Sequence, residues 1–88
     1  MANQHSEQKA TDTEVEMVRT MLRIAADIDR LGQLSDQQPL PASTLRAAPG
    51  LLRTGEDLRA RAEQAAYFKQ CPVLLQLVEE DRRQRPQK

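Results

Sequence analysis

The chain has 88 residues, with 13 basic and 13 acidic side chains, one tyrosine, one phenylalanine and no tryptophan. This length allows one domain at most, and the balanced charge provides no overall field to draw the protein onto nucleic acid, an anionic membrane or an acidic substrate. The lone Cys71 excludes an internal disulfide, and Cys71 with His5 cannot supply the four ligands of a structural zinc site. We therefore expect no metal and no cofactor, and an aliphatic core that is marginal without oligomerisation.

Residues 1–10 are polar and show no periodicity, which predicts a disordered arm. This segment lacks the apolar stretch of a signal peptide, and no apolar run in the chain approaches the roughly twenty residues of a membrane span. A cytoplasmic protein without a membrane partner is the expectation. The helical signal begins after the arm, and we expect one helical domain over residues 11–84, followed by a disordered tail at 85–88.

The first predicted helix covers about residues 13–32. Thr11 with Glu14, and Thr13 with Glu16, both fit the capping box, in which a hydroxyl and a carboxylate satisfy each other's backbone amides. Gly32 offers a left-handed stop at the other end. Two apolar rows lie side by side on this helix: Val15, Val18, Leu22 and Ala25 in one, and Met17, Met21, Ile24, Ile28 and Leu31 in the other. Together they span roughly 200°, more than a one-sided helix needs.

Four proline and glycine residues mark the segment after this helix as an extended connection, with a short helical turn predicted at 43–48: Pro39, Pro41, Pro49 and Gly50. Thr54, followed by acidic residues, is the expected start of a helix at 55–70. The buried positions expected on that helix are Leu58, Ala62, Ala65, Ala66 and Phe68.

Pro72 either kinks this helix or occupies the first turn of a new one, and we expect a new helix at 72–84. The 3.6-residue pattern predicts that its apolar side chains are buried, namely Val73, Leu74, Leu77 and Val78. Its charged side chains should be exposed, namely Glu79, Glu80, Asp81, Arg82 and Arg83. Because no run alternates with a period of two, the expected fold is all-α, a small bundle of three to four helices with disordered termini.

The second apolar row has the alternating four-three spacing of a coiled-coil contact: Met17, Met21, Ile24, Ile28 and Leu31. Since the later helices offer few large side chains, we expect this row to bind a protein partner, with a homodimer as the simplest form. Arg23, Arg30 and Asp29 would set the orientation from its edge. Two alternatives stay open: the row is internal core, or Asp29 lies at an edge near the helix end and reaches solvent or a local Arg.

A second hypothesis is a dimeric nucleic-acid regulator that uses arginines of the second half: Arg46, Arg53, Arg59 and Arg61. Interleaved acidic residues and the lack of an aromatic residue among these arginines disfavour it. An enzyme is not expected, since the chain has no glycine-rich phosphate loop and no nucleophile beside a base, and no small-molecule substrate is implied.

The function favoured by the sequence is a non-enzymatic protein–protein interaction module, a cytoplasmic adaptor, regulator or inhibitor that self-associates or masks a larger protein through its first helix. A structural subunit of a larger assembly is a further alternative.

Overall fold

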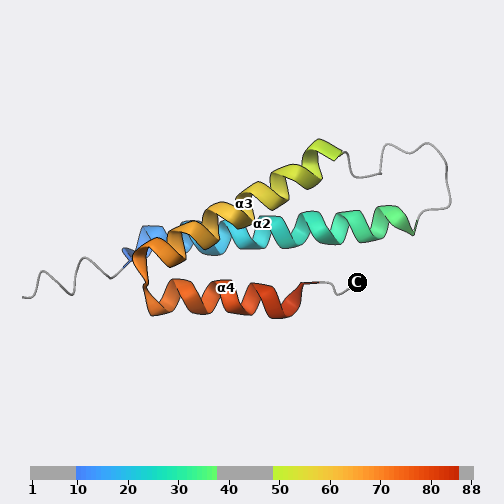
Figure 1. Ribbon diagram of the computed structural model, residues 1–88. Coiled ribbons are helices and arrows are strands. Elements are labelled where there is room, and N and C mark those ends of the chain that lie inside the picture. The colour runs from blue at the N-terminus through green and yellow to red at the C-terminus, as the bar shows by residue number, and fades with distance from the viewer. Residues whose placement is uncertain (1–9, 38–48, 86–88) are drawn as a thin grey trace, which may run out of the picture.

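The computed structural model describes residues 10–37 and 49–85, which form three α-helices in the order α2, Asp12–Asp36; α3, Pro49–Lys69; and α4, Pro72–Gln84 (Figure 1). These residues contain no strand, and the expected all-helical bundle is confirmed. Residues 1–9 of the expected arm, the short helix expected at 43–48 and residues 86–88 lie outside the described part of the chain. No helix within the described ranges is long and apolar enough to cross a membrane.

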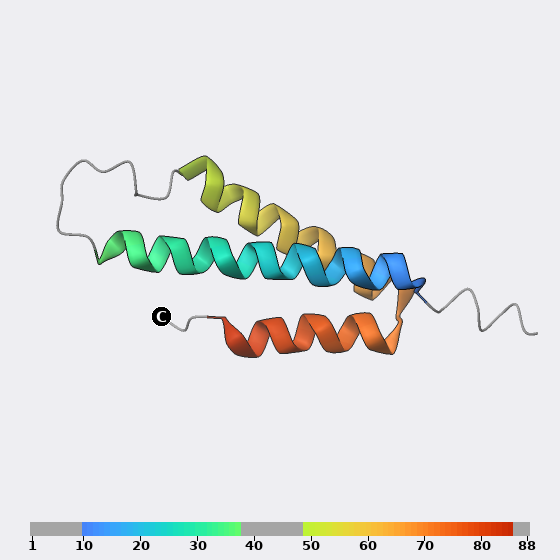
Figure 2. The same cartoon turned by 180° about the vertical axis from the view of Figure 1, so that it is seen from behind.

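Helix α2 packs along both other helices, and α3 and α4 also contact each other. Because α4 has 13 residues and α2 has 25, α4 accompanies only the N-terminal part of α2. The C-terminal end of α2 and the beginning of α3 extend beyond the end of α4, as both views show (Figures 1 and 2). Within the described residues, one side of the long α2–α3 pair therefore has no third helix beside it over much of its length.

The N-terminus of α2 is closed by the capping box of Thr11 and Glu14, which confirms one of the two boxes suggested by the sequence. The Glu14 amide donates to Thr11 Oγ1 at 3.1 Å, and the Thr11 amide donates to Glu14 Oε1 at 2.9 Å. At the other end, α2 continues four residues past Gly32 to Asp36, so the predicted stop at Gly32 is wrong. A Cβ at this glycine would lie 3.4 Å from Leu52 Cδ2, which indicates that its small size serves the approach of α3.

Helix α3 begins at Pro49, six residues before the predicted start. Proline suits the first helical turn because the amide it lacks would have no partner there. Thr54 is an interior residue whose hydroxyl donates to the Gly50 carbonyl at 3.0 Å, so it does not cap the helix. The helix ends at Lys69, and Gln70 adopts a left-handed conformation with φ 51°.

Pro72 begins a new helix, as predicted, with Cys71 in extended conformation just before it. The core lies where the three helices meet and consists mainly of Val18, Leu22, Ala62, Ala66, Cys71, Leu74 and Val78. Ala25 and Ile28 of α2 are also buried. The alanines of α3 allow it to approach α2 closely, which offsets the scarcity of large apolar side chains on α3.

Three predicted positions are wrong. Phe68 is 89% exposed, because it lies two residues from Ala66 and so about 200° around the helix from that buried position. Val73, also expected in the core, is about half exposed. Asp81 was expected in solvent but is only 8% exposed, since it follows Val78 by three residues and therefore lies on the buried face of α4. Leu58, Ala65 and Leu77 are partly buried.

Candidate interaction surface

The two apolar rows of α2 have different environments. Val18, Leu22 and Ala25 of the first row are buried, and Val15 is partly buried. In the second row, Met17 is 53% exposed, Ile24 42% and Leu31 38%. These three side chains lie seven residues apart, which places them in one line along α2. We call them the exposed stripe.

The remaining two members of the second row turn toward α3. Met21 is partly buried, and Ile28 is buried against Gly55, where a Cβ would lie 3.1 Å from Ile28 Cγ2. Ile28 therefore belongs to the core of this chain and is not available to a partner. Spacing alone could not separate these residues from the stripe, because all five share one broad face of the helix.

The stripe adjoins a shallow apolar groove between α2 and α3. This groove has a volume of about 120 Å³, and Met17, Met21 and Ala65 contribute apolar surface to it. Its end is marked by an ion pair between Lys69 Nζ and Glu14 Oε2 at 3.0 Å. The apolar surface thus extends from the N-terminal end of the stripe across to α3, and Leu74 of α4 also lines the groove.

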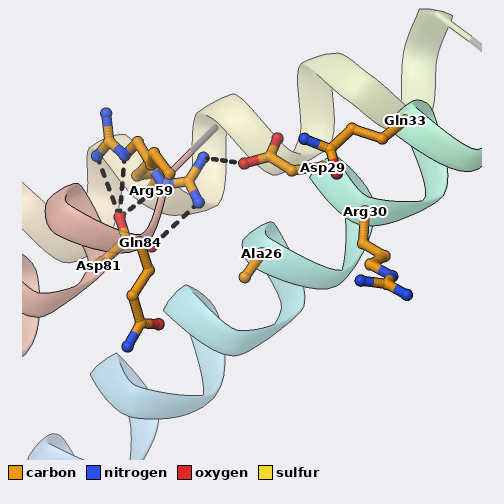
Figure 3. A pocket seen from close by; sticks show the side chains of 8 residues that line it. Ala26, Asp29, Arg30, Gln33, Arg59, Asp81 and Gln84 are labelled. Atoms are coloured by element: carbon orange, nitrogen blue, oxygen red, sulfur yellow. Dashed lines mark hydrogen bonds and ion pairs between the residues drawn. The ribbon is translucent and has the colours of Figure 1, made fainter. Parts of the chain in front are cut away.

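The three charged residues predicted at the edge of this surface differ in their exposure and pairing. Arg23 and Arg30 are exposed on α2. Asp29 is partly buried and accepts a hydrogen bond from Arg59 Nη1 at 3.0 Å; this arginine lies 30 residues away on α3 and is not a local partner on the same helix. Figure 3 shows Asp29 pointing toward Arg59 and Arg30 pointing away from it.

Arg59 is the centre of a buried ion-pair cluster. Its Nε donates to Asp81 Oδ2 at 2.7 Å and its Nη2 donates to Asp81 Oδ1 at 3.0 Å, a two-point contact between α3 and α4. Together with the bond to Asp29, these contacts join all three helices through one guanidinium (Figure 3). Burial lowers the pKa of Arg59, but the hydrogen bonds and charges of Asp81 and Asp29 outweigh it and hold that pKa above its ordinary value.

The cluster continues along α3 and α4. Arg85 Nη2 lies 3.1 Å from Asp81 Oδ2 and donates to Glu63 Oε2 at 2.7 Å. Arg82 donates to the Tyr67 hydroxyl at 2.7 Å, and its guanidinium carbon lies 5.9 Å from the centroid of that ring. Positive and negative groups alternate along this series, so its charges are satisfied by one another.

An open cleft of about 220 Å³ borders Arg59, and its lining includes Ala26, Asp29, Arg30, Asp81 and Gln84. Its two most buried charged side chains, Arg59 and Asp81, already neutralise each other, so the cleft presents no unpaired buried charge that would bind an ionic ligand. We assign it a structural role. The sequence carried a signal for this cluster that was missed: Arg59 lies four residues after Gly55 and three before Ala62, on the buried face of α3.

The arginines considered for nucleic-acid binding do not form one surface. Arg59 is only 9% exposed and is bound to two carboxylates, so it cannot reach a phosphate. Arg61 is exposed, but its Nε donates to Asp57 at 2.8 Å. Arg53 is exposed, and Arg46 lies outside the described residues.

Cys71 is buried at the start of α4. The backbone amide of Leu74 is the largest influence on its thiol and lowers the pKa, while burial acts in the opposite direction. A thiolate at this position would have little access to a reagent. Within residues 10–37 and 49–85, no group of three or more His, Cys, Asp or Glu side chains is arranged to hold a metal ion.

Comparisons of this chain with protein-family models, with curated proteins and with solved structures found no match.

Proposed function

We propose that this protein is a small non-enzymatic interaction module that binds protein through the exposed stripe of α2, and that its simplest complex is a homodimer. The observation that carries this proposal is the exposure of Met17, Ile24 and Leu31 in one line along a long helix. An aligned apolar stripe next to an apolar groove is typical of a surface that another helix covers.

The size of the chain supports the same proposal. Its buried core is built largely from Val, Leu and Ala, with no aromatic residue among its members in the described ranges. A domain of this size buries a smaller fraction of its surface than a larger one, and association commonly supplies the missing stability. Covering the stripe would remove three large apolar side chains from water on each copy.

A regulator or adaptor role in the cytoplasm is part of the proposal. Cys71 forms no disulfide within the chain, which suits a reducing compartment. A module of this kind would act by masking or linking surfaces, without chemistry of its own.

The test compares solution mass, measured by light scattering from about 1 μM to 1 mM, for the wild type and for the double variant Met17→Glu with Ile24→Glu. Both positions are exposed, so the variant should keep the wild-type helix content in circular dichroism. We expect a wild-type dimer and a folded monomeric variant. Phe68→Glu is the matched control, because it introduces the same charge at an exposed apolar position on α3 and should leave the dimer intact.

A wild-type chain that stays monomeric over the whole concentration range would overturn the proposal. Equal dimerisation of the double variant and the wild type would also overturn it, because the stripe would then not be the contact surface.

A further inference from the structure

The charges beside the exposed stripe also indicate how a partner would be oriented. On the side of the stripe away from Met21 and Ile28, the exposed charged residues of α2 include, in chain order, Glu16, Arg23, Asp27 and Arg30. Within the described residues, Arg23, Asp27 and Arg30 form no ion pair, and Glu16 has only an exposed local pair with Arg19 at 2.9 Å. We call these four residues the charged flank.

We infer that the partner of the stripe is a second copy of α2 in antiparallel orientation, related by a two-fold axis that passes beside Ile24. This inference rests on the proposed function and adds the partner's orientation and register. The stripe is symmetric about this position, since Met17 and Leu31 each lie seven residues from Ile24. Around such an axis, Ile24 meets its own copy, and Met17 of each copy meets Leu31 of the other.

In this arrangement the charged flanks of the two copies lie on the same side of the contact, and most of their close approaches join opposite charges. A two-fold axis at residue 24 brings residue 25 of the second copy level with Arg23, and Asp27 of that copy is two residues away, about 3 Å along the helix. The same offset separates Glu16 of one copy from Arg30 of the other. Symmetry produces four such acid–base approaches in the dimer, against one like-charge approach with the same axial offset, between the two Arg23 side chains.

A parallel pair in register lacks these contacts between charged flanks. Its two-fold axis runs parallel to the helices, which places the charged flanks of the two copies on opposite sides of the contact, so that they do not face each other. The net charge of the chain is zero, so overall repulsion does not oppose association of two copies. The local charge order thus selects the antiparallel arrangement.

The test exchanges the central charges. Arg23→Glu and Asp27→Arg should each weaken the dimer about tenfold, because each replaces two attractive pairs with two repulsive ones. An equimolar mixture of the two variants should restore dimerisation as a heterodimer, since a Glu at 23 in one chain would then face an Arg at 27 in the other. Arg83→Glu on α4 is the matched control and should not change the dissociation constant.

Mixing the two variants also separates contacts between copies from charge effects within one helix. Residues 23 and 27 are four apart, so each single variant introduces a like-charge neighbour on its own helix. That effect stays in each chain when the variants are mixed, and recovery on mixing therefore reports contact between copies.

A second measurement uses disulfide cross-linking. Met17→Cys and Leu31→Cys place thiols at exposed positions, and the wild type, whose only thiol is the buried Cys71, is the blank. Under mild oxidation, we expect a mixture of the two variants to form the mixed disulfide, and each variant alone to cross-link poorly. The products are distinguished by mass spectrometry.

Efficient cross-linking of Met17→Cys with itself would overturn the antiparallel register, as would a dimer that is unaffected by both single charge exchanges. In either case, loss of the dimer in Met17→Glu with Ile24→Glu would still support the proposed function. A monomeric wild type is the result that removes the proposed function itself.

Discussion

Arg59 of α3 and Asp81 of α4 form a two-point contact with N–O distances of 2.7 and 3.0 Å, and both side chains are almost completely buried. The two residues are 22 positions apart in the sequence, so this ion pair links two helices and does not stabilise a single helical turn. Among the ion pairs of the described residues, it has the least exposed partners.

Removing one partner of this ion pair should lower the stability of the fold. Asp81→Asn leaves the Arg59 guanidinium buried with Asp29 as its remaining carboxylate, and we expect the free energy of unfolding to fall by about 3 kcal/mol. Urea denaturation followed by circular dichroism measures the change. Asp57→Asn is the control, because Asp57 and Arg61 make a pair of similar length on an exposed surface, where the loss should stay below about 0.5 kcal/mol. Equal effects at the two sites would contradict the structural role of the buried pair.

Gly55 should tolerate no large side chain. A Cβ at this position would already lie within 3.1 to 3.4 Å of three atoms of Ile28, so Gly55→Leu must separate α2 from α3. We expect a loss of about 2 kcal/mol in the free energy of unfolding from overpacking. Gly50→Leu is the control, since a Cβ there meets nothing within 4 Å, and its place in the first turn gives a smaller gain in helix propensity than at the interior Gly55. The difference between the two variants is therefore a lower bound on the packing contribution, and a Gly55→Leu protein as stable as Gly50→Leu would refute the close contact.

Glu14 should make stability depend on pH. The hydrogen bond from the Thr11 backbone is the largest cause that lowers the Glu14 pKa, and the ammonium of Lys69 lowers it further. Since the pKa is lower in the folded state, the stabilisation is fully present above the unfolded value of about 4.3 and is lost as the pH falls through the folded value. We expect Glu14→Gln to have a lower melting temperature than the wild type at pH 7 and a nearly equal one at pH 2.

The glutamine in this variant can still accept the Thr11 amide bond, so the difference reports the charge and not the cap. A melting-temperature difference that stays constant from pH 7 to pH 2 would exclude an ionic contribution from Glu14.

Cys71 should react slowly in spite of its lowered pKa. The amide of Leu74 favours the thiolate, but the side chain is buried, and a reagent can reach it only when α4 opens. We expect thiol titration with a disulfide reagent to be at least about a hundredfold slower in buffer than in 6 M guanidinium chloride. Similar rates in the two solutions would place Cys71 at an accessible site.

Features whose partners lie within a few residues were predictable from the sequence. The capping box of Thr11 and Glu14 closes over three residues, and the break before Pro72 follows from the missing amide of proline, so both needed only local information. The start of α3 at Pro49 was also a local signal, but Thr54 competed with it as a cap. The seven-residue spacing of Met17, Ile24 and Leu31 was likewise present in the sequence alone.

The tertiary structure decided which of these apolar residues remain exposed and which charges are buried. A helical wheel gives the angle of each side chain around α2, but it does not say on which side α3 and α4 lie, and hence it could not separate Ile28 from Ile24. The bonds of Arg59 span 30 residues to Asp29 and 22 to Asp81, and only the packing of three helices brings such distant groups into contact. Burial depends on that packing, so only the tertiary structure could identify the ion-pair cluster and the exposed stripe.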